Sequence, residues 1–297
     1  STAIGFATLS AQNFTTATDA YNVAIGHGAG GSVTTGTQNT LIGGLAGDAL
    51  TTGTQNVAIG YDALGSEDTA SHNVAIGREA LKTQDGAEYN VAVGRTAGML
   101  ITVGEGNTLI GGLAGDALTD ADFNVAVGKN ALSSDTLGSF STAVGINALE
   151  SQNFATATQT YNTAVGALAG GAVTSGVQNT LIGAQVGDAL TQGARNTALG
   201  YSALTADTLG QYAVAIGYKA LASQNFTTAT NNYNIGIGYE AGGSVSTGTN
   251  NTLLGGLAGD QLTVGSSNVG VGYSTLGSDT KGSKSIAIGR AELNEQN

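Results

Sequence analysis

The feature that most constrains this chain is an internal repeat that runs through all 297 residues. The pentad Asn-Val-Ala-Ile-Gly at 22–26 returns at 56–60 and 73–77, and close variants of it fill the rest of the sequence. The last residue of the pentad is called the key glycine below. Successive key glycines are 17 residues apart, except in three longer units of 21 residues that begin at Gly5, Gly145 and Gly217. The repeat predicts one continuous array over residues 1–297, with no linker and no second domain.

Each pentad alternates polar, β-branched, small and β-branched residues before its glycine, a pattern typical of a short β-strand that ends in a turn. The 48 glycines and the lack of a sustained helical stripe disfavour helices. A unit of this size cannot bury its own apolar face, so it must stack on its neighbours. We therefore expect an all-β fold, a parallel β-solenoid of 17 units, each 17 or 21 residues long and forming one coil.

The residue four before the key glycine, called the asparagine position, is Asn in thirteen of the seventeen units and Ser or Ala in the others. Stacked in register, such amides can form a hydrogen-bonded ladder. We therefore assign a structural role to Asn22 and Asn56, and to the key glycines Gly26 and Gly60.

The residues four and seven positions after the key glycine are predicted to fill the core, one of them in some coils and the other in the rest. Four residues after it, Leu and Gly alternate strictly in pairs from Leu9 to Leu293. Where Gly stands there, the residue three further on is aliphatic; where Leu stands there, that residue is polar, as in Gln12, Glu67, Gln84 and Asp135. Because interiors tolerate neither voids nor overpacking, each coil should take one apolar plug, such as Leu64 or Leu132, from either place. On this interpretation Leu132→Ala is costly and Asp135→Ala is nearly silent, and the pairing itself stays unexplained.

The pentad strand is small or apolar on both faces, because Val23 and Ile25 point away from Ala24. Burial on both faces is expected, one against the core of the coil and the other against a partner. The simplest partner is another copy of the chain, and we predict a homotrimer.

Aromatic residues mark the candidate ligand-facing surface. Five tyrosines directly follow a key glycine, at a position that also accepts Phe6, Arg, His27 and Gly44 and must therefore be partly exposed: Tyr61, Tyr201, Tyr218, Tyr239 and Tyr273. Three more, Phe14, Phe154 and Phe226, lie in the longer units, whose extra residues should bulge from one side. These phenylalanines either face a ligand or fold back over their own coil.

Charge and residue usage exclude several classes of function. With 9 basic and 21 acidic residues and a net charge of −12, we expect no nucleic acid partner. No apolar run approaches the roughly 20 residues that span a bilayer, so we expect no membrane insertion. No initiator Met and no signal-peptide pattern are present, which suggests a processed or excised segment.

Nothing in the sequence suggests catalysis, and we expect no enzyme. His27 and His72 lie in different units without a recurring Ser or carboxylate beside them. Cysteine is absent, so disulfides and zinc thiolates are excluded. A repeated Asp is too widely spaced in one chain to surround a calcium ion, and we expect no metal and no cofactor: Asp48, Asp116, Asp188 and Asp260.

The pentads, and the longer run Asn-Thr-Ala-Leu-Gly-Tyr-Ser-Ala-Leu at 196–204, resemble the head repeats of YadA-like trimeric autotransporter adhesins and similar repeats of phage tail-fibre proteins. The resemblance implies a left-handed β-roll with three chains around one axis. It also implies an extracellular location, on a cell surface or virion, and attachment to a host-surface glycan or protein receptor. We therefore expect a structural and adhesive fibre segment.

Two alternatives remain. An ice-binding β-solenoid is suggested by the Thr-Gly-Thr runs at 35–37, 52–54 and 247–249, although the other units do not keep both threonines. A polysaccharide-binding or polysaccharide-degrading solenoid is the second, although no paired carboxylates repeat along the chain.

Overall fold

The computed structural model describes residues 1–291, and within them every regular element is a β-strand. The strands form a parallel β-solenoid of about 17 turns, which confirms the predicted all-β solenoid class. The chain forms two compact units, unit 1 with Ser1–Ser141 and Asn153–Gln159, and unit 2 with Thr142–Gln152 and Thr160–Asn297. The prediction of one continuous array concerns how these units join, and it stays a prediction.

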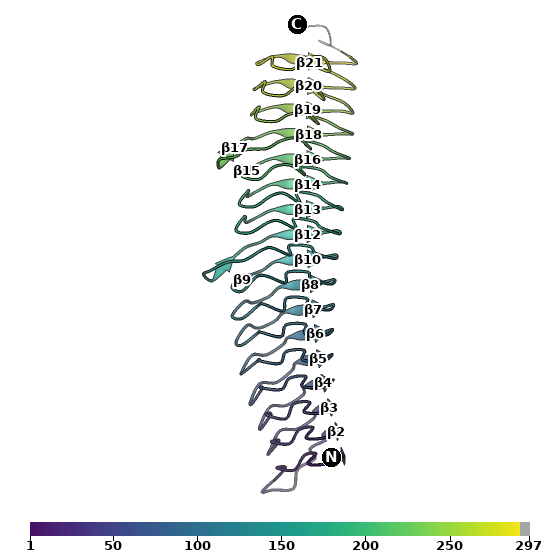
Figure 1. The fold of residues 1–297 in the computed structure, drawn as a ribbon, viewed down its shortest axis with the longest axis vertical. Helices are drawn as coiled ribbons and strands as arrows, with labels where there is room; N and C mark the ends of the chain where they lie inside the picture. Colours follow the sequence, from purple (N-terminus) through teal and green to yellow (C-terminus); the bar gives the residue numbers. More distant parts are fainter. Residues whose placement is uncertain (292–297) are drawn as a thin grey trace. The chain divides into compact units, whose positions relative to one another are not determined.

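Each unit stacks three-residue strands in parallel, one per coil (Figure 1). In unit 1 they are β1 Thr2–Ile4, β2 Val23–Ile25, β3 Thr40–Ile42, β4 Val57–Ile59, β5 Val74–Ile76, β6 Val91–Val93, β7 Thr108–Ile110 and β8 Val125–Val127. In unit 2 they are β10 Thr142–Val144, β12 Thr163–Val165, β13 Thr180–Ile182, β14 Thr197–Leu199, β16 Val214–Ile216, β18 Ile235–Ile237, β19 Thr252–Leu254, β20 Val269–Val271 and β21 Ile286–Ile288. The structure also has two short parallel strand pairs, β9 Gly138–Ser139 with β11 Thr158–Gln159, and β15 Gly210–Gln211 with β17 Thr230–Asn231.

The key glycine ends each strand because no other residue fits there. Gly26 has a φ of +139°, and a Cβ on it would lie 2.3 Å from the carbonyl oxygen of Gly43 in the next coil. At Gly60 the same atom would lie 2.5 Å from the carbonyl oxygen of Gly77. Both the backbone conformation and the close approach of successive coils therefore require glycine.

The strands separate an inner from an outer face. Ala24, in the middle of β2, is completely buried and pairs in register with the buried Leu41 of β3. Its neighbours Val23 and Ile25 face outward and are only partly covered. A buried middle residue recurs in the other three-residue strands except β1, whose three residues are all exposed, so the outer face carries two rows of partly exposed side chains.

Both predicted plug positions lie in the core. Leu64 and Leu132 are fully buried in Leu-type coils, as are Val33 and Leu50 at the alternative position of Gly-type coils. These burials confirm that each coil draws its apolar plug from one of two places. Leu293, the last member of the series, lies outside the described residues.

The expectation that the alternative position is exposed in Leu-type coils is wrong. Glu67 and Asp135 are fully buried there. Glu67 Oε1 accepts hydrogen bonds from the backbone N–H groups of Thr69 at 3.0 Å and Ala70 at 2.6 Å. A buried carboxylate is stable only when its oxygens are hydrogen-bonded, and the turn that follows supplies these donors.

A contact between buried polar side chains explains why Leu-type coils come in pairs. Gln84 Nε2 donates to Glu67 Oε2 at 3.2 Å, and Gln224 Nε2 donates to Asp207 Oδ2 at 2.6 Å. In the sequence, a carboxylate stands in the first coil of such a pair and Gln in the second. Each side chain satisfies the other, so the two coils must be adjacent.

Gly-type coils come in pairs because one leucine packs between them. A Cβ on Gly30 would lie 2.7 Å from a methyl of Leu41, and a Cβ on Gly47 would lie 2.9 Å from the other methyl. The same arrangement holds in later coils, for Leu109 between Gly98 and Gly115, Leu181 between Gly170 and Gly187, and Leu253 between Gly242 and Gly259. Two kinds of contact, each between two adjacent coils, thus produce the four-coil period.

These contacts predict that Leu132→Ala and Asp135→Ala both destabilise unit 1. The first leaves a core cavity and should cost about 2–5 kcal/mol. The second leaves the backbone N–H groups of Gly138 and Phe154 without their acceptor and should cost about 2–4 kcal/mol. Chemical unfolding and hydrogen exchange near the mutated coil measure both. The exposed Glu105→Ala is the control, and an Asp135→Ala protein as stable as that control would contradict the account.

Candidate functional site

The asparagine position is a buried structural element. The backbone N–H of Asn39 donates to Asn22 Oδ1 at 2.9 Å, and the backbone N–H of Asn56 donates to Asn39 Oδ1 at 2.9 Å. Each side-chain Nδ2 also donates to a carbonyl 14 residues further on, as from Asn39 to Gly53 and from Asn56 to Ala70. The ladder therefore joins amide side chains to the backbone, and these asparagines are not available to a ligand.

The carboxylate and glutamine pairs connect to this ladder. Asn90 Nδ2 donates to Gln84 Oε1 at 3.1 Å, and Asn234 Nδ2 donates to Gln224 Oε1 at 2.8 Å. A chain of hydrogen bonds thus runs from carboxylate to glutamine to asparagine inside the core. Burial raises the pKa of the Asp207 carboxyl at the start of one such chain, although its hydrogen bonds from Gln224 and the backbone oppose the rise.

The longer coils compensate for missing rungs of the ladder. Each of the three follows a unit in which Ser or Ala replaces Asn, as in Ala213 before the coil that starts at Gly217. There the backbone N–H of Asn234 donates to Asn232 Oδ1 at 2.9 Å, an acceptor two residues before it in its own coil. The sequence carries this signal, since each longer unit follows a unit with Ser or Ala at the asparagine position.

Two of the three phenylalanines of the longer coils are buried, so the ligand-facing interpretation is wrong for Phe154 and Phe226, which are only 7% and 6% exposed. Two backbone hydrogen bonds fix the position of Phe226. Its N–H donates to Asp207 Oδ1 at 3.1 Å, and its carbonyl accepts from Thr208 Oγ1 at 2.9 Å. The ring therefore folds back over the core, while the next three residues, 227–229, are exposed.

The third phenylalanine of the longer coils, Phe14, is half-buried. The turn that carries β17 extends beyond its neighbours (Figure 1).

The tyrosines after the key glycines are exposed, and three of them lie together. In unit 2 the rings of Tyr201 and Tyr218 stack with centroids 5.8 Å apart, and those of Tyr218 and Tyr239 stack 5.3 Å apart with planes 7° from parallel. Tyr61 of unit 1 and Tyr273 of unit 2 are similarly exposed. The structure thus brings together three of the five predicted tyrosines.

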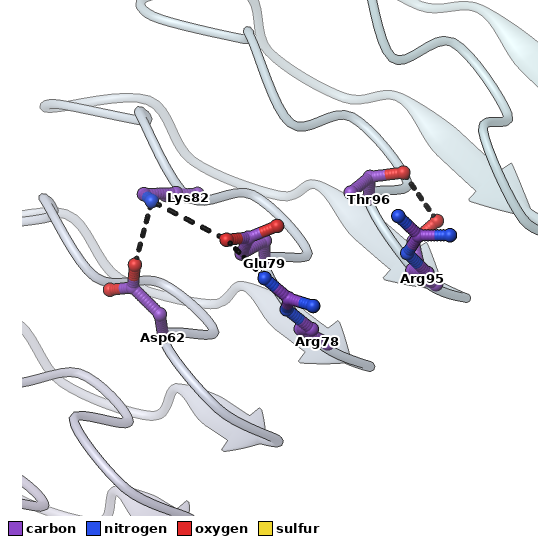
Figure 2. Close-up of polar contacts among 6 residues, drawn as sticks. All are labelled: Asp62, Arg78, Glu79, Lys82, Arg95 and Thr96. Carbon is purple, nitrogen blue, oxygen red and sulfur yellow. Dashed lines mark hydrogen bonds and ion pairs between the residues drawn. The ribbon is translucent and has the colours of Figure 1, made fainter.

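A network of charges lies beside the corresponding surface of unit 1. Lys82 Nζ lies 2.8 Å from Asp62 Oδ2 and 3.6 Å from Glu79 Oε1, and Arg78 pairs with Glu79 at 3.3 Å (Figure 2). The hydrogen bond that Lys82 donates to Asp62 raises the pKa of the lysine, and the charge of the same carboxylate adds to the rise. The lysine thus bridges two coils and covers the surface between them.

The remaining titratable candidates lie in separate surroundings within the described residues. His27 stacks on Phe6, and His72 stacks on Tyr89. Asp48 and Asp116 have pKa values raised mainly by burial, and a side-chain oxygen of each has no hydrogen-bond partner among residues 1–291. Over the same described range, no group of three His, Asp or Glu side chains is placed to hold a metal ion.

Comparison with known proteins gives no relative. No family model, no curated protein and no solved structure matches the chain. In the described part of the chain there is also no helix long and apolar enough to cross a bilayer.

The burial difference between the aromatic groups predicts effects of different size for two serine substitutions. Phe226→Ser should destabilise unit 2 by about 3 kcal/mol or more, because a buried ring is lost from its coil. Tyr61→Ser, which removes a half-exposed ring, should cost less than about 1 kcal/mol. Thermal unfolding of the two variants decides, and a Phe226→Ser protein that melts with the parent would show that the ring does not support the core.

Proposed function

We propose that this chain is a structural and adhesive segment of a fibre, that it works as a homotrimer outside the cell, on a cell surface or virion, and that it attaches to a glycan or protein receptor. The proposal assigns it no catalytic activity and no cofactor. The observation that carries it is the outer face of the strands.

That face is uncharged and unbroken within each unit. Its first row contains Val, Ile and Thr, and its second row contains only Ile, Val and Leu, in every strand from β1 to β8 and in every three-residue strand of unit 2. Several side chains of the second row are substantially exposed, including Ile110 at 40% and Leu199 at 45%. A continuous exposed row of aliphatic residues marks an interaction surface.

The spacing of the rows favours a second copy as the partner. The side chains of each row recur once per coil, at the strand spacing of about 4.8 Å. A globular partner has no such period, whereas another copy of this chain repeats it coil for coil. Side chains from like faces can then interdigitate along the whole length, and a closed ring of three copies leaves no face exposed to water.

The distribution of charge supports the same assembly. Charged residues are absent from the two rows but are present just after the key glycines, as at Arg78, Glu79 and Lys219. Interface cores are depleted of charge relative to the rest of a protein surface. The charged and tyrosine-bearing side of each coil would remain available for attachment.

Sedimentation velocity of the purified chain at micromolar concentration tests the assembly. We expect a trimer for the parent chain and monomers for Ile110→Glu, because a carboxylate would be buried without a partner in the interface. The matched control is Thr156→Glu, which adds the same charge on an exposed turn and should leave the trimer intact. A monomeric parent protein would refute the proposal. Thermal hysteresis in the same samples would instead support an ice-binding protein.

A further inference from the structure

Unit 2 has a polar groove beside its tyrosine column. The groove has a volume of about 460 Å³. Its lining includes the small residues Ala222 and Gly243 from successive coils. The charged Lys219 and Glu240 line it as well. Because it crosses four coils, from Thr205 to Asp260, the groove is about 14 Å long at the strand spacing of a β-solenoid.

The groove is open because the lining residues Ala222 and Gly243 are small. Ala222 lies five residues after a key glycine, in the second coil of a Leu-type pair. The equivalent residues of two earlier Leu-type pairs are Lys82 and Glu150. Lys82 crosses to Asp62 at 2.8 Å and fills the space (Figure 2). Glu150 is tied down as well, since its Oε2 accepts from Asn147 Nδ2 at 2.6 Å. Alanine at 222 leaves the space open.

The charged side chains of the groove are not paired with each other. In the described residues, ion pairs within 4 Å form only among the Asp62, Arg78, Glu79 and Lys82 side chains. Lys219 and Glu240 therefore line the groove with a donor and an acceptor that no ion pair occupies. Burial raises the pKa of the Asp260 carboxyl at the end of the groove, and the charge of Glu240 adds to the rise.

Exposed aromatic rings lie beside the charged side chains of the groove. Lys219 Nζ lies 5.4 Å from the centre of the Tyr218 ring. The charge of Glu240, and the hydrogen bond that the Tyr239 hydroxyl donates to it, raise the pKa of that hydroxyl. Ser223 and Ser244 add hydroxyl groups to the lining.

We propose that this groove binds a short, linear, neutral oligosaccharide. A sugar chain presents hydroxyl groups at regular intervals, which carboxylates accept from and an ammonium donates to, with charge-assisted hydrogen bonds. Its apolar ring faces suit the tyrosine border. Two carboxylates and a net charge of −12 disfavour anionic ligands. The inference rests on the proposed attachment role for its biological setting, and it names the ligand class and the site.

The test is titration of the full chain with chitotetraose, cellotetraose and mannotetraose, and with sialyllactose as the anionic comparison, followed by saturation-transfer NMR and calorimetry. We expect at least one neutral oligosaccharide to bind. We expect Ala222→Glu to weaken that binding at least tenfold, because the new side chain fills the groove as Glu150 fills its own coil. The control is Thr228→Glu, which places the same charge on the exposed turn of unit 2 and should bind like the parent.

Three results would overturn the site: no binding of any neutral oligosaccharide, binding of sialyllactose alone, or equal binding by Ala222→Glu. Thermal unfolding verifies that Ala222→Glu is folded, and Lys219→Gln supplies a second variant in which the groove stays open but loses its charged donor. Lys219→Gln should also weaken binding. Sedimentation of the same samples reports the trimer separately, so a failed assembly and a failed groove are distinguishable.

Discussion

The buried side-chain amide of the asparagine position is the interaction on which the coil stack depends. A strand of three residues supplies few ladder hydrogen bonds, and the backbone must turn away from it at once. Asn39, directly before β3, satisfies two buried backbone groups that precede the next strand β4, the N–H of Asn56 and the carbonyl of Gly53. Because unsatisfied backbone groups in a dry core are costly, the amide fixes where each coil begins relative to the last.

The remaining core contacts are arranged around this ladder. Leucine packed between two glycines and carboxylate bonded to glutamine each need two neighbouring coils, and together they impose a period of four. The longer coils fit the same logic, since Asn232 supplies the acceptor that Ala213 cannot. Side-chain chemistry inside the stack thus accounts for both the alternation and the insertions.

Much of this architecture could be predicted from the sequence, because a repeat displays the same physical requirement many times. The strands, the key glycines and the two plug positions follow from periodicity and residue size. Asp135 was misjudged because a polar residue in one unit suggests exposure, whereas its partners are backbone groups brought close only by folding. The sequence does not decide the place of Phe226 for the same reason, because the groups that hold its backbone come from another coil. The groove over Ala222 had no signal in the sequence, since a small residue marks a space only once its neighbours are placed.

Hydrogen exchange after Asn39→Leu tests most directly whether the buried amides hold the stack. Leucine has a similar size and keeps the core filled, but it removes the acceptor of the Asn56 N–H and the donor to the Gly53 carbonyl. The account predicts that amides in residues 36–60 lose about 2–5 kcal/mol of protection. Gln38→Ala, at the exposed neighbouring position, should leave protection unchanged. Full protection of the Asn39→Leu protein would contradict the account and assign the stability of the stack to apolar packing alone.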